Sequence, residues 1–273
     1  MASGRTTSGA EHICQRSPIH VMGAVWLALV MREMRGRVSV HRLGAFWLLA
    51  EPIAHVLVLV GIFTLVRGRT LPGVEYPVFL VSGVVPFLMM KNVALRTMEG
   101  VASNKALFSY RQIKPLDTLA ARAIVELILS ICVYISISFV LGFWAGYDVL
   151  IHHPLEWFAN FIVAAILSMA LGIIFCILGE ALPESKTVFR LIFLPLYFVS
   201  AVIFPIWMIP QDLMPYLLWN PFLHVINEFR QSAFENYPVI HGVTIIYPAG
   251  VSLVMLFLGL ALYRVRRLKL GAI

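Results

Sequence analysis

Six apolar runs of membrane-spanning length constrain the fold of this chain more than any other feature. A transmembrane helix needs about 20 predominantly apolar residues in succession. Runs of this kind lie at 44–66, 77–97, 120–146, 158–179, 187–206 and 244–263. They take up most of the 273 residues, so no extramembrane domain of ordinary size remains. The sequence therefore predicts an all-α integral-membrane protein, with six transmembrane helices in a single domain covering 1–273.

The composition excludes an ordinary soluble domain. Hydrophobic residues make up 60% of the chain and charged residues only 13%, whereas about a quarter of a soluble domain is charged. The formal net charge of +7 would suggest nucleic-acid binding in a soluble protein, but in a membrane protein it indicates Lys and Arg anchors on the cytoplasmic side. We therefore expect membrane lipids as partners and no nucleic acid.

Lys and Arg are distributed unevenly between the two sides of the predicted spans. Seventeen of the 21 lie on one side, in the N-terminal arm, the second-to-third connection, the turn after the fourth span and the tail 264–273. Only Arg67, Arg69 and Arg230 lie on the other side. Because cytoplasmic loops carry the excess of positive charge, both termini and the tail are expected in the cytoplasm.

Two segments resemble neither spans nor ordinary loops. The apolar part of the stretch 18–40 is too short to cross the bilayer. A signal peptide is also excluded, because Arg32, Arg35 and Arg37 occupy the place where its cleavage site would be. We expect this stretch to form an interfacial helix along the inner leaflet. The aromatic segment 205–243 is broken by five prolines, which predicts one or two short re-entrant helices on the external side.

Three ionisable residues lie inside predicted spans, where a charge is costly and often functional. Glu51, Lys91 and Glu126 each lie about 9 to 11 Å in from the cytoplasmic end of their helix, at 1.5 Å per residue. We expect Lys91 to pair with Glu51 or Glu126, with His55 one turn beyond Glu51. Such a group is either a structural ion pair between spans or a polar lining at the inner mouth of a pathway.

The sequence carries no recognisable catalytic or metal-binding motif. Lys186 and Thr187 lack the glycines of a phosphate-binding loop, so the chain is not expected to hydrolyse ATP itself. The other candidate ligands are His152, His153, Glu156, Cys14, Cys132 and Cys176. The histidines and Glu156 fit a solvated external loop, and the cysteines fit buried free thiols. We expect no catalytic residue, no metal and no cofactor bound by this chain.

The connector between the second and third spans, 104–122, mixes cations with apolar side chains in a segment predicted to be cytoplasmic. It could be a basic anchor that faces the lipid surface. Alternatively, it is a short helix whose aromatic residues insert into a groove of a partner protein. Spacing alone leaves both interpretations open.

Five segments resemble the ABC-2 type permease family, and most closely the permease subunits of capsular polysaccharide exporters. They are RLGAFWLLAEPIAH (42–55), GRTLPGVEYPVFLVSGVVPF (68–87), NKALFSYRQIKPLDTLAARAIVE (104–126), LYFVSAVIFP (196–205) and YLLWNPFLHVINEFR (216–230). The resemblance implies a homodimer bound to two separate ATP-binding cassette ATPase subunits, which would hold ATP and Mg. It also implies that lipid-linked acidic glycans are exported from a bacterial inner membrane to periplasmic and outer-membrane proteins.

The resemblance also assigns roles to individual residues. The connector would be the coupling helix that contacts the ATPase, through Lys105, Leu107, Phe108, Tyr110 and Arg111. The turn GEALPESKT would be a second contact, with Glu184 as its candidate residue. Aromatic faces suit contact with sugar rings. Channel-lining candidates are Tyr197, Phe198, Trp207, Tyr216 and Trp219, against the alternative of an interfacial aromatic belt.

Other functions fit parts of the pattern. A permease for lipid-linked O-antigen or teichoic acid would share the same architecture. A membrane enzyme of glycan-lipid assembly predicts a cluster of catalytic Asp or His at one membrane face. An ion-coupled transporter that uses Glu51, Lys91 and Glu126 as a proton relay predicts inverted repeats. The sequence displays neither of these last two features.

Overall fold

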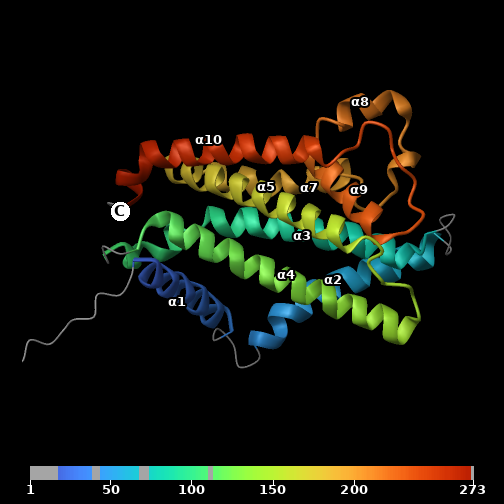
Figure 1. Cartoon of the computed structure of the whole chain (residues 1–273), viewed down its shortest axis with the longest axis horizontal. Coiled ribbons are helices and arrows are strands. Elements are labelled where there is room, and N and C mark those ends of the chain that lie inside the picture. The colour runs from blue at the N-terminus through green and yellow to red at the C-terminus, as the bar shows by residue number, and fades with distance from the viewer. Residues whose placement is uncertain (1–17, 39–43, 68–73, 110–112, 272–273) are drawn as a thin grey trace, which may run out of the picture.

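The computed structural model describes residues 18–38, 44–67, 74–109 and 113–271, which form helices that run along one another in an elongated bundle (Figure 1). The long helices are α1 (Pro18–Val38), α2 (Gly44–Arg67), α3 (Tyr76–Met98), α4 (Pro115–Ala145), α5 (Pro154–Ala181) and α10 (Ile246–Gly271). The shorter ones are η1 (Ala102–Ser109), α6 (Ser185–Leu191), α7 (Phe193–Val199), η2 (Ile206–Met208), η3 (Gln211–Leu213), α8 (Met214–Leu217) and α9 (Pro221–Ala233). By length and composition, α3, α4, α5 and α10 can each cross a membrane.

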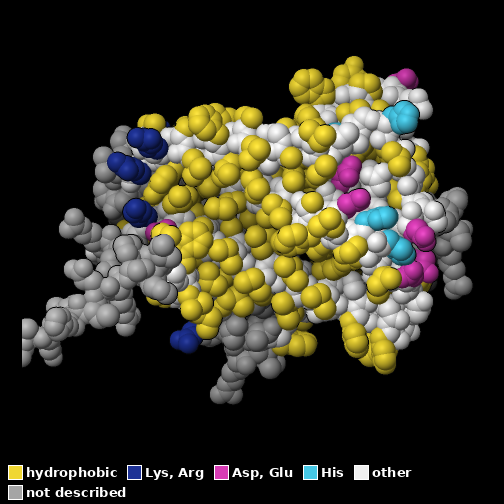
Figure 2. Space-filling view, viewed as in Figure 1, with side chains coloured by type: hydrophobic (Ala, Val, Ile, Leu, Met, Phe, Trp, Pro, Cys, Tyr) yellow, Lys and Arg dark blue, Asp and Glu magenta, His cyan; other side chains and the backbone are white. Residues whose placement is uncertain are grey.

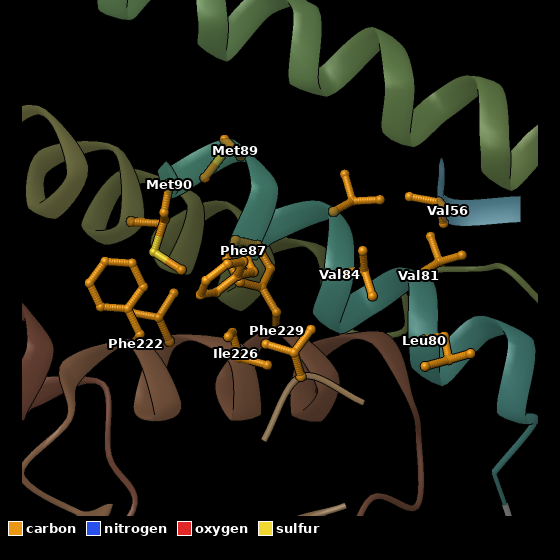
Figure 3. Packing of buried hydrophobic residues seen from close by; sticks show 14 of the residues in the cluster. Val56, Leu80, Val81, Val84, Phe87, Met89, Met90, Phe222, Ile226 and Phe229 are labelled. Atoms are coloured by element: carbon orange, nitrogen blue, oxygen red, sulfur yellow. The ribbon is translucent and has the colours of Figure 1, made fainter. Parts of the chain in front are cut away.

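Helix α3 forms the centre of the bundle and packs against α4, α5 and α9. Its Phe87 and Met90 lie against Phe222 and Ile226 of α9 in the main hydrophobic cluster (Figure 3). On another side, α5 approaches α3 closely at Gly172, where an added Cβ would lie 2.5 Å from the Cβ of Thr97. The missing side chain therefore sets the spacing of these two helices.

Most predicted spans correspond to helices. The runs 77–97, 158–179 and 244–263 fall in α3, α5 and α10, and the run 44–66 falls in α2. Helix α4 begins at Pro115, five residues before the predicted start at 120. Proline is favoured in a first helical turn, and the Asp117 carboxylate accepts a hydrogen bond from the Lys114 backbone N–H at 2.9 Å. The capped turn thus extends this helix beyond its apolar run.

The predicted span 187–206 is not one continuous helix. It forms α6 and α7, each seven residues long, separated at Ile192. Pro195 has no N–H with which to bond the Leu191 carbonyl one turn earlier, so one helical hydrogen bond is missing. Ile192 itself keeps right-handed helical backbone angles, with φ of −62° and ψ of −25°. The helical part ends at Val199, and the count of six spans stays a prediction.

The two segments outside the predicted spans are both helical. Helix α1 occupies 18–38 and packs against α4, where the Trp26 indole N–H donates to Asp117 at 3.2 Å. The segment 205–243 contains η2, η3, α8 and α9. Helix α9 has 13 residues, or about 20 Å, and is too short for a hydrocarbon core of about 30 Å. Its re-entrant placement stays a prediction.

The molecular surface separates apolar and charged side chains. Hydrophobic side chains cover most of the face in Figure 2, with Lys and Arg near the end that carries the C terminus and most Asp, Glu and His toward the opposite end. Cys176 is buried as predicted, but the prediction for Cys132 is wrong because its side chain is exposed on α4. In a protein whose solvent is lipid, an apolar residue need not be buried to be protected from water. Cys14 lies outside the described residues.

Candidate functional site

A cavity of about 330 Å³ opens between four helices and combines charged with apolar walls. Helix α1 contributes Arg37, and α2 contributes Pro52 and His55. The remaining lining residues are Val85, Leu88, Met89, Lys91, Asn92 and Arg96 from α3, and Glu126, Leu129, Ser130 and Val133 from α4. Three cations and one carboxylate therefore face this space from the described part of the chain.

Glu126 is the centre of an ion-pair network on one side of the cavity. Its side chain is only 6% exposed, and it pairs with Arg37 of α1 and with Arg96 of α3, the latter at 3.5 Å. A second link joins Arg122 of α4 to Glu33 of α1 at 3.2 Å. A buried carboxylate is tolerated only with such partners, so these contacts attach α1 to α4.

Of the two alternative partners predicted for Lys91, Glu126 is wrong and Glu51 stays a prediction. Lys91 lines the same cavity as Glu126 and His55, but it forms no ion pair with any residue that the structure describes. Instead Glu126 takes Arg37, a residue 89 positions earlier in the chain that no helical spacing relates to it. The side chain of Glu51 lies outside the described residues. The three helices do bring Lys91, His55 and Glu126 together, as expected from their shared depth.

The connector that was predicted to contact a partner forms the short helix η1. Lys105 is exposed, whereas Leu107 and Phe108 are partly buried. Phe108 packs on a buried cluster of its own chain that includes Val101 and Leu119. Tyr110 and Arg111 lie outside the described residues. The coupling role of these residues stays a prediction.

Two ion pairs that sequence reasoning missed involve α6: one joins it to the start of this connector, and the other joins it to the end of α5. Glu99, at the end of α3, pairs with Arg190 of α6 at 2.5 Å, and Glu180 pairs with Lys186 at 2.7 Å. Glu184, the predicted second contact residue, is exposed beside them at the start of α6. One ion pair, between Glu99 and Arg190, thus joins the two predicted contact regions within the chain.

The predicted channel-lining aromatic residues do not share one environment. Tyr197 packs against the core, and its ring centroid lies 5.0 Å from that of Phe87. The ring centroids of Trp207 and Tyr237 lie 5.4 Å apart. Phe198 is 51% exposed, and Tyr216 and Trp219 are 78% and 80% exposed. The last two lie on and next to α8, which projects from the bundle in Figure 1. Their contact with a glycan stays a prediction.

Arg230 of α9 is a central residue at the end of the bundle that carries α8, and sequence reasoning counted it only as a charge. It is 1% exposed, and its guanidinium donates to the carbonyls of Ala201 and Val202 at 2.8 and 2.5 Å. The guanidinium carbon also lies 3.7 Å from the ring centroid of Phe79 in α3. The side chain of Arg230 thus connects three parts of the fold: α9 itself, helix α3, and the segment that follows α7. The sequence did contain a signal for this role, because a single arginine among apolar residues needs polar partners inside the protein.

Two histidines hold loops at the end of the bundle that carries α8. His224 bridges the Leu218 carbonyl at 2.8 Å and the Thr244 backbone N–H at 3.2 Å. Because Nδ1 accepts the second bond, Nε2 carries the proton, and burial lowers the pKa of His224. His152, predicted to be solvated, is partly buried and bonds through Nδ1 to the Ala233 carbonyl at 2.9 Å. Among described residues, no three His, Cys, Asp or Glu side chains converge as metal ligands.

Comparison with known proteins identifies the family. The model of the ABC-2 type transporter family matches residues 24–234. The chain is 39% identical over 251 residues to the polysialic acid transport protein KpsM of Escherichia coli, covering 92% of this chain and 96% of the relative. It is 24% identical to the capsule polysaccharide export inner-membrane protein BexB of Haemophilus influenzae, over 91% and 93% of the two chains. It is 20% identical to the O-antigen export system permease protein RfbA of Myxococcus xanthus, over 88% and 92%. This chain belongs to the ABC-2 type transporter family.

Proposed function

We propose that this chain is the membrane-spanning subunit of an ATP-driven exporter that moves lipid-linked capsular polysaccharide across a bacterial inner membrane. The observation that carries the proposal is the similarity to KpsM along nearly the full length of both chains. The apolar helices α3, α4, α5 and α10 support a membrane location, and the excess of cations in the inner cavity suits an acidic substrate.

The finer parts of the proposal follow from the family. The working unit is a homodimer of six-span subunits with two ATPase subunits, and ATP and Mg belong to those ATPases. Coupling runs through η1, with Lys105, Leu107, Phe108, Tyr110 and Arg111, and through Glu184. The exposed positions of Lys105 and Glu184 support contact with a partner. Both termini are cytoplasmic, and the polymer passes on to periplasmic and outer-membrane export proteins.

A gene deletion tests this function by locating the polymer. Total and surface polysaccharide are quantified in the deletion strain and in the same strain complemented with the wild-type gene. Export predicts that polymer accumulates inside the cell while total polymer persists. Loss of all polymer would indicate a synthetic enzyme, and a normal surface coat would refute capsule export.

O-antigen export is the second candidate, because RfbA aligns over most of its length with this chain. The two candidates differ in which surface glycan disappears in the deletion strain. Loss of O-antigen from the surface with an intact capsule would favour the second candidate over the first.

A further inference from the structure

We propose that the cavity between α1, α2, α3 and α4 binds one anionic group, a phosphate or a carboxylate, and that Glu126 competes with this anion for the arginines of the site. The proposal rests on the export function above and assigns the recognition of one acidic group to named residues of this cavity. Its ligand class is an oxyanion, carried either by a lipid headgroup or by a sugar acid.

The charge of the lining favours an anion. Arg37, Lys91 and Arg96 face the cavity against the single carboxylate of Glu126, among the described residues. Lys91 has no ion-pair partner in the described part of the chain. The Nη2 atom of Arg37 lies 3.8 Å from a carboxylate oxygen of Glu33 but is buried without a hydrogen-bond partner. Cations outnumber carboxylates in this lining, and cations are costly inside an apolar bundle. An oxyanion here would accept hydrogen bonds from Lys91 and from Nη2 of Arg37.

The size of the cavity restricts what can enter. Its volume of about 330 Å³ lies at the small end of the range for ligand pockets, about 300–1,000 Å³. This volume suits a headgroup-sized oxyanion with a few waters rather than a run of sugar rings. Leu88, Met89, Leu129 and Val133 provide apolar wall beside the cations, which suits an amphipathic ligand.

Glu126 presents to Arg37 and Arg96 the same chemical group as the proposed ligand. Its carboxylate pairs with both guanidiniums, which bind carboxylates and phosphates through the same planar fork. An entering oxyanion therefore has to compete with Glu126. When the anion takes Arg37, α1 loses one link to α4 and keeps the link from Glu33 to Arg122. Ligand binding is thereby coupled to the position of α1.

The test measures anion binding to the purified full-length chain in neutral phosphatidylcholine nanodiscs. One arm titrates short-chain phosphatidylglycerol, which carries a phosphodiester, and the other titrates a sialic acid oligosaccharide, which carries carboxylates. The variants are Lys91→Gln, Glu126→Gln and the control Arg266→Gln. Arg266 is exposed on α10 and is absent from the cavity lining, so its variant removes one positive charge without touching the site.

Lys91→Gln is expected to weaken binding roughly tenfold in the arm that carries the true ligand, which corresponds to about 1.4 kcal/mol. Glu126→Gln is expected to tighten binding roughly tenfold, and Arg266→Gln to leave it unchanged. The arm in which Lys91→Gln acts distinguishes phosphate from carboxylate. Equal binding by wild type and Lys91→Gln in both arms would overturn the anion site, and unchanged or weaker binding by a folded Glu126→Gln would overturn the competition.

Lys91→Gln removes no ion pair among the described residues, so this variant tests the site even if Glu126→Gln fails to fold. The result is independent of the export proposal. Binding that depends on Lys91 while the deletion strain keeps a normal surface coat would leave the site standing and refute the substrate. If polymer accumulates inside the deletion strain but binding does not depend on Lys91, the export function stands and the anion site is refuted.

Discussion

At the scale of single residues, Arg230 organises the end of the bundle that carries α8 and α9. Its guanidinium holds the Ala201 and Val202 carbonyls directly after α7, where Ala201 adopts a left-handed conformation with φ of 53°. Such a conformation costs a non-glycine residue roughly 1 kcal/mol or more and persists where surrounding contacts impose it. Space for the guanidinium comes from Gly83 of α3, whose added Cβ would lie 2.3 Å from Nη2 of Arg230.

Gly83→Ala is therefore expected to destabilise the protein by about 1–3 kcal/mol, the usual cost of overpacking a filled core. The new methyl group would also lie 2.9 Å from the Val202 carbonyl oxygen. A shift of the Arg230 side chain alone would therefore not relieve the overpacking. The measurement is thermal unfolding of the purified protein in detergent. Gly250→Ala is the matched control, because nothing lies within 4 Å of its added Cβ. Equal unfolding temperatures for the two variants would contradict the packing of Arg230.

A second residue-scale prediction concerns pH and Glu228 of α9. Burial, and then the nearby charge of Glu156, raise the pKa of Glu228 to about 7 from an ordinary value of 4.5. The folded state thus holds the Glu228 proton more tightly than the unfolded chain does. Proton binding at Glu228 therefore raises the free energy of unfolding fully below pH 4.5, and this contribution is lost as pH rises toward 7.

Thermal stability is expected to fall across this pH window in the wild type and to fall less in Glu228→Gln. Glu235→Gln, a change at an exposed acid close in sequence, is the control and should retain the wild-type pH dependence. If Glu228→Gln and the wild type lose the same stability between pH 4.5 and 7, the environment assigned to Glu228 is wrong.

At the scale of elements, α6 is linked to the connector region by the pair of Glu99 and Arg190. Their side chains are 31% and 53% exposed, so the pair contributes only about 0.2–1 kcal/mol to stability. Its position matters more, because it ties the entrance of η1 to the helix that precedes α7. We expect this pair to take part in coupling between the connector and α6.

Arg190→Glu is expected to reduce surface polysaccharide severalfold while the protein still inserts, because two like charges would repel at this link. The double variant Glu99→Arg with Arg190→Glu restores opposite charges and is expected to recover export. Surface polymer is measured in the deletion strain complemented with each variant. Failure of the double variant to improve on Arg190→Glu would show that the pair is not a link in coupling.

At the scale of the whole molecule, charge is segregated to the two ends of an apolar bundle (Figure 2). The excess of Lys and Arg near the C terminus predicts that this end is cytoplasmic. Trp219→Cys and Arg266→Cys test this in a chain whose three native cysteines are replaced by serine. A membrane-impermeant maleimide is expected to label position 219 in intact spheroplasts and position 266 only after permeabilisation. Labelling of 266 in intact spheroplasts would reverse the orientation.

The sequence by itself determined which segments are helices in an apolar solvent. Hydrophobic length and the chemistry of helix starts are local properties, so α3, α5 and α10 could be predicted from their runs alone. The shared depth of Lys91 and Glu126 was also readable, because rise per residue is fixed. The family resemblance, too, was carried by local motifs and is borne out by the match over 24–234.

The tertiary structure decided which charges meet. Glu126 pairs with Arg37 rather than Lys91, Arg190 reaches Glu99, and Arg230 turns inward to two carbonyls. None of these contacts follows from helical spacing, since each joins different elements whose approach is set by packing of side chains such as those around Gly83. An ion pair depends on distances of a few ångströms between helices, and those distances are fixed only when the whole bundle packs.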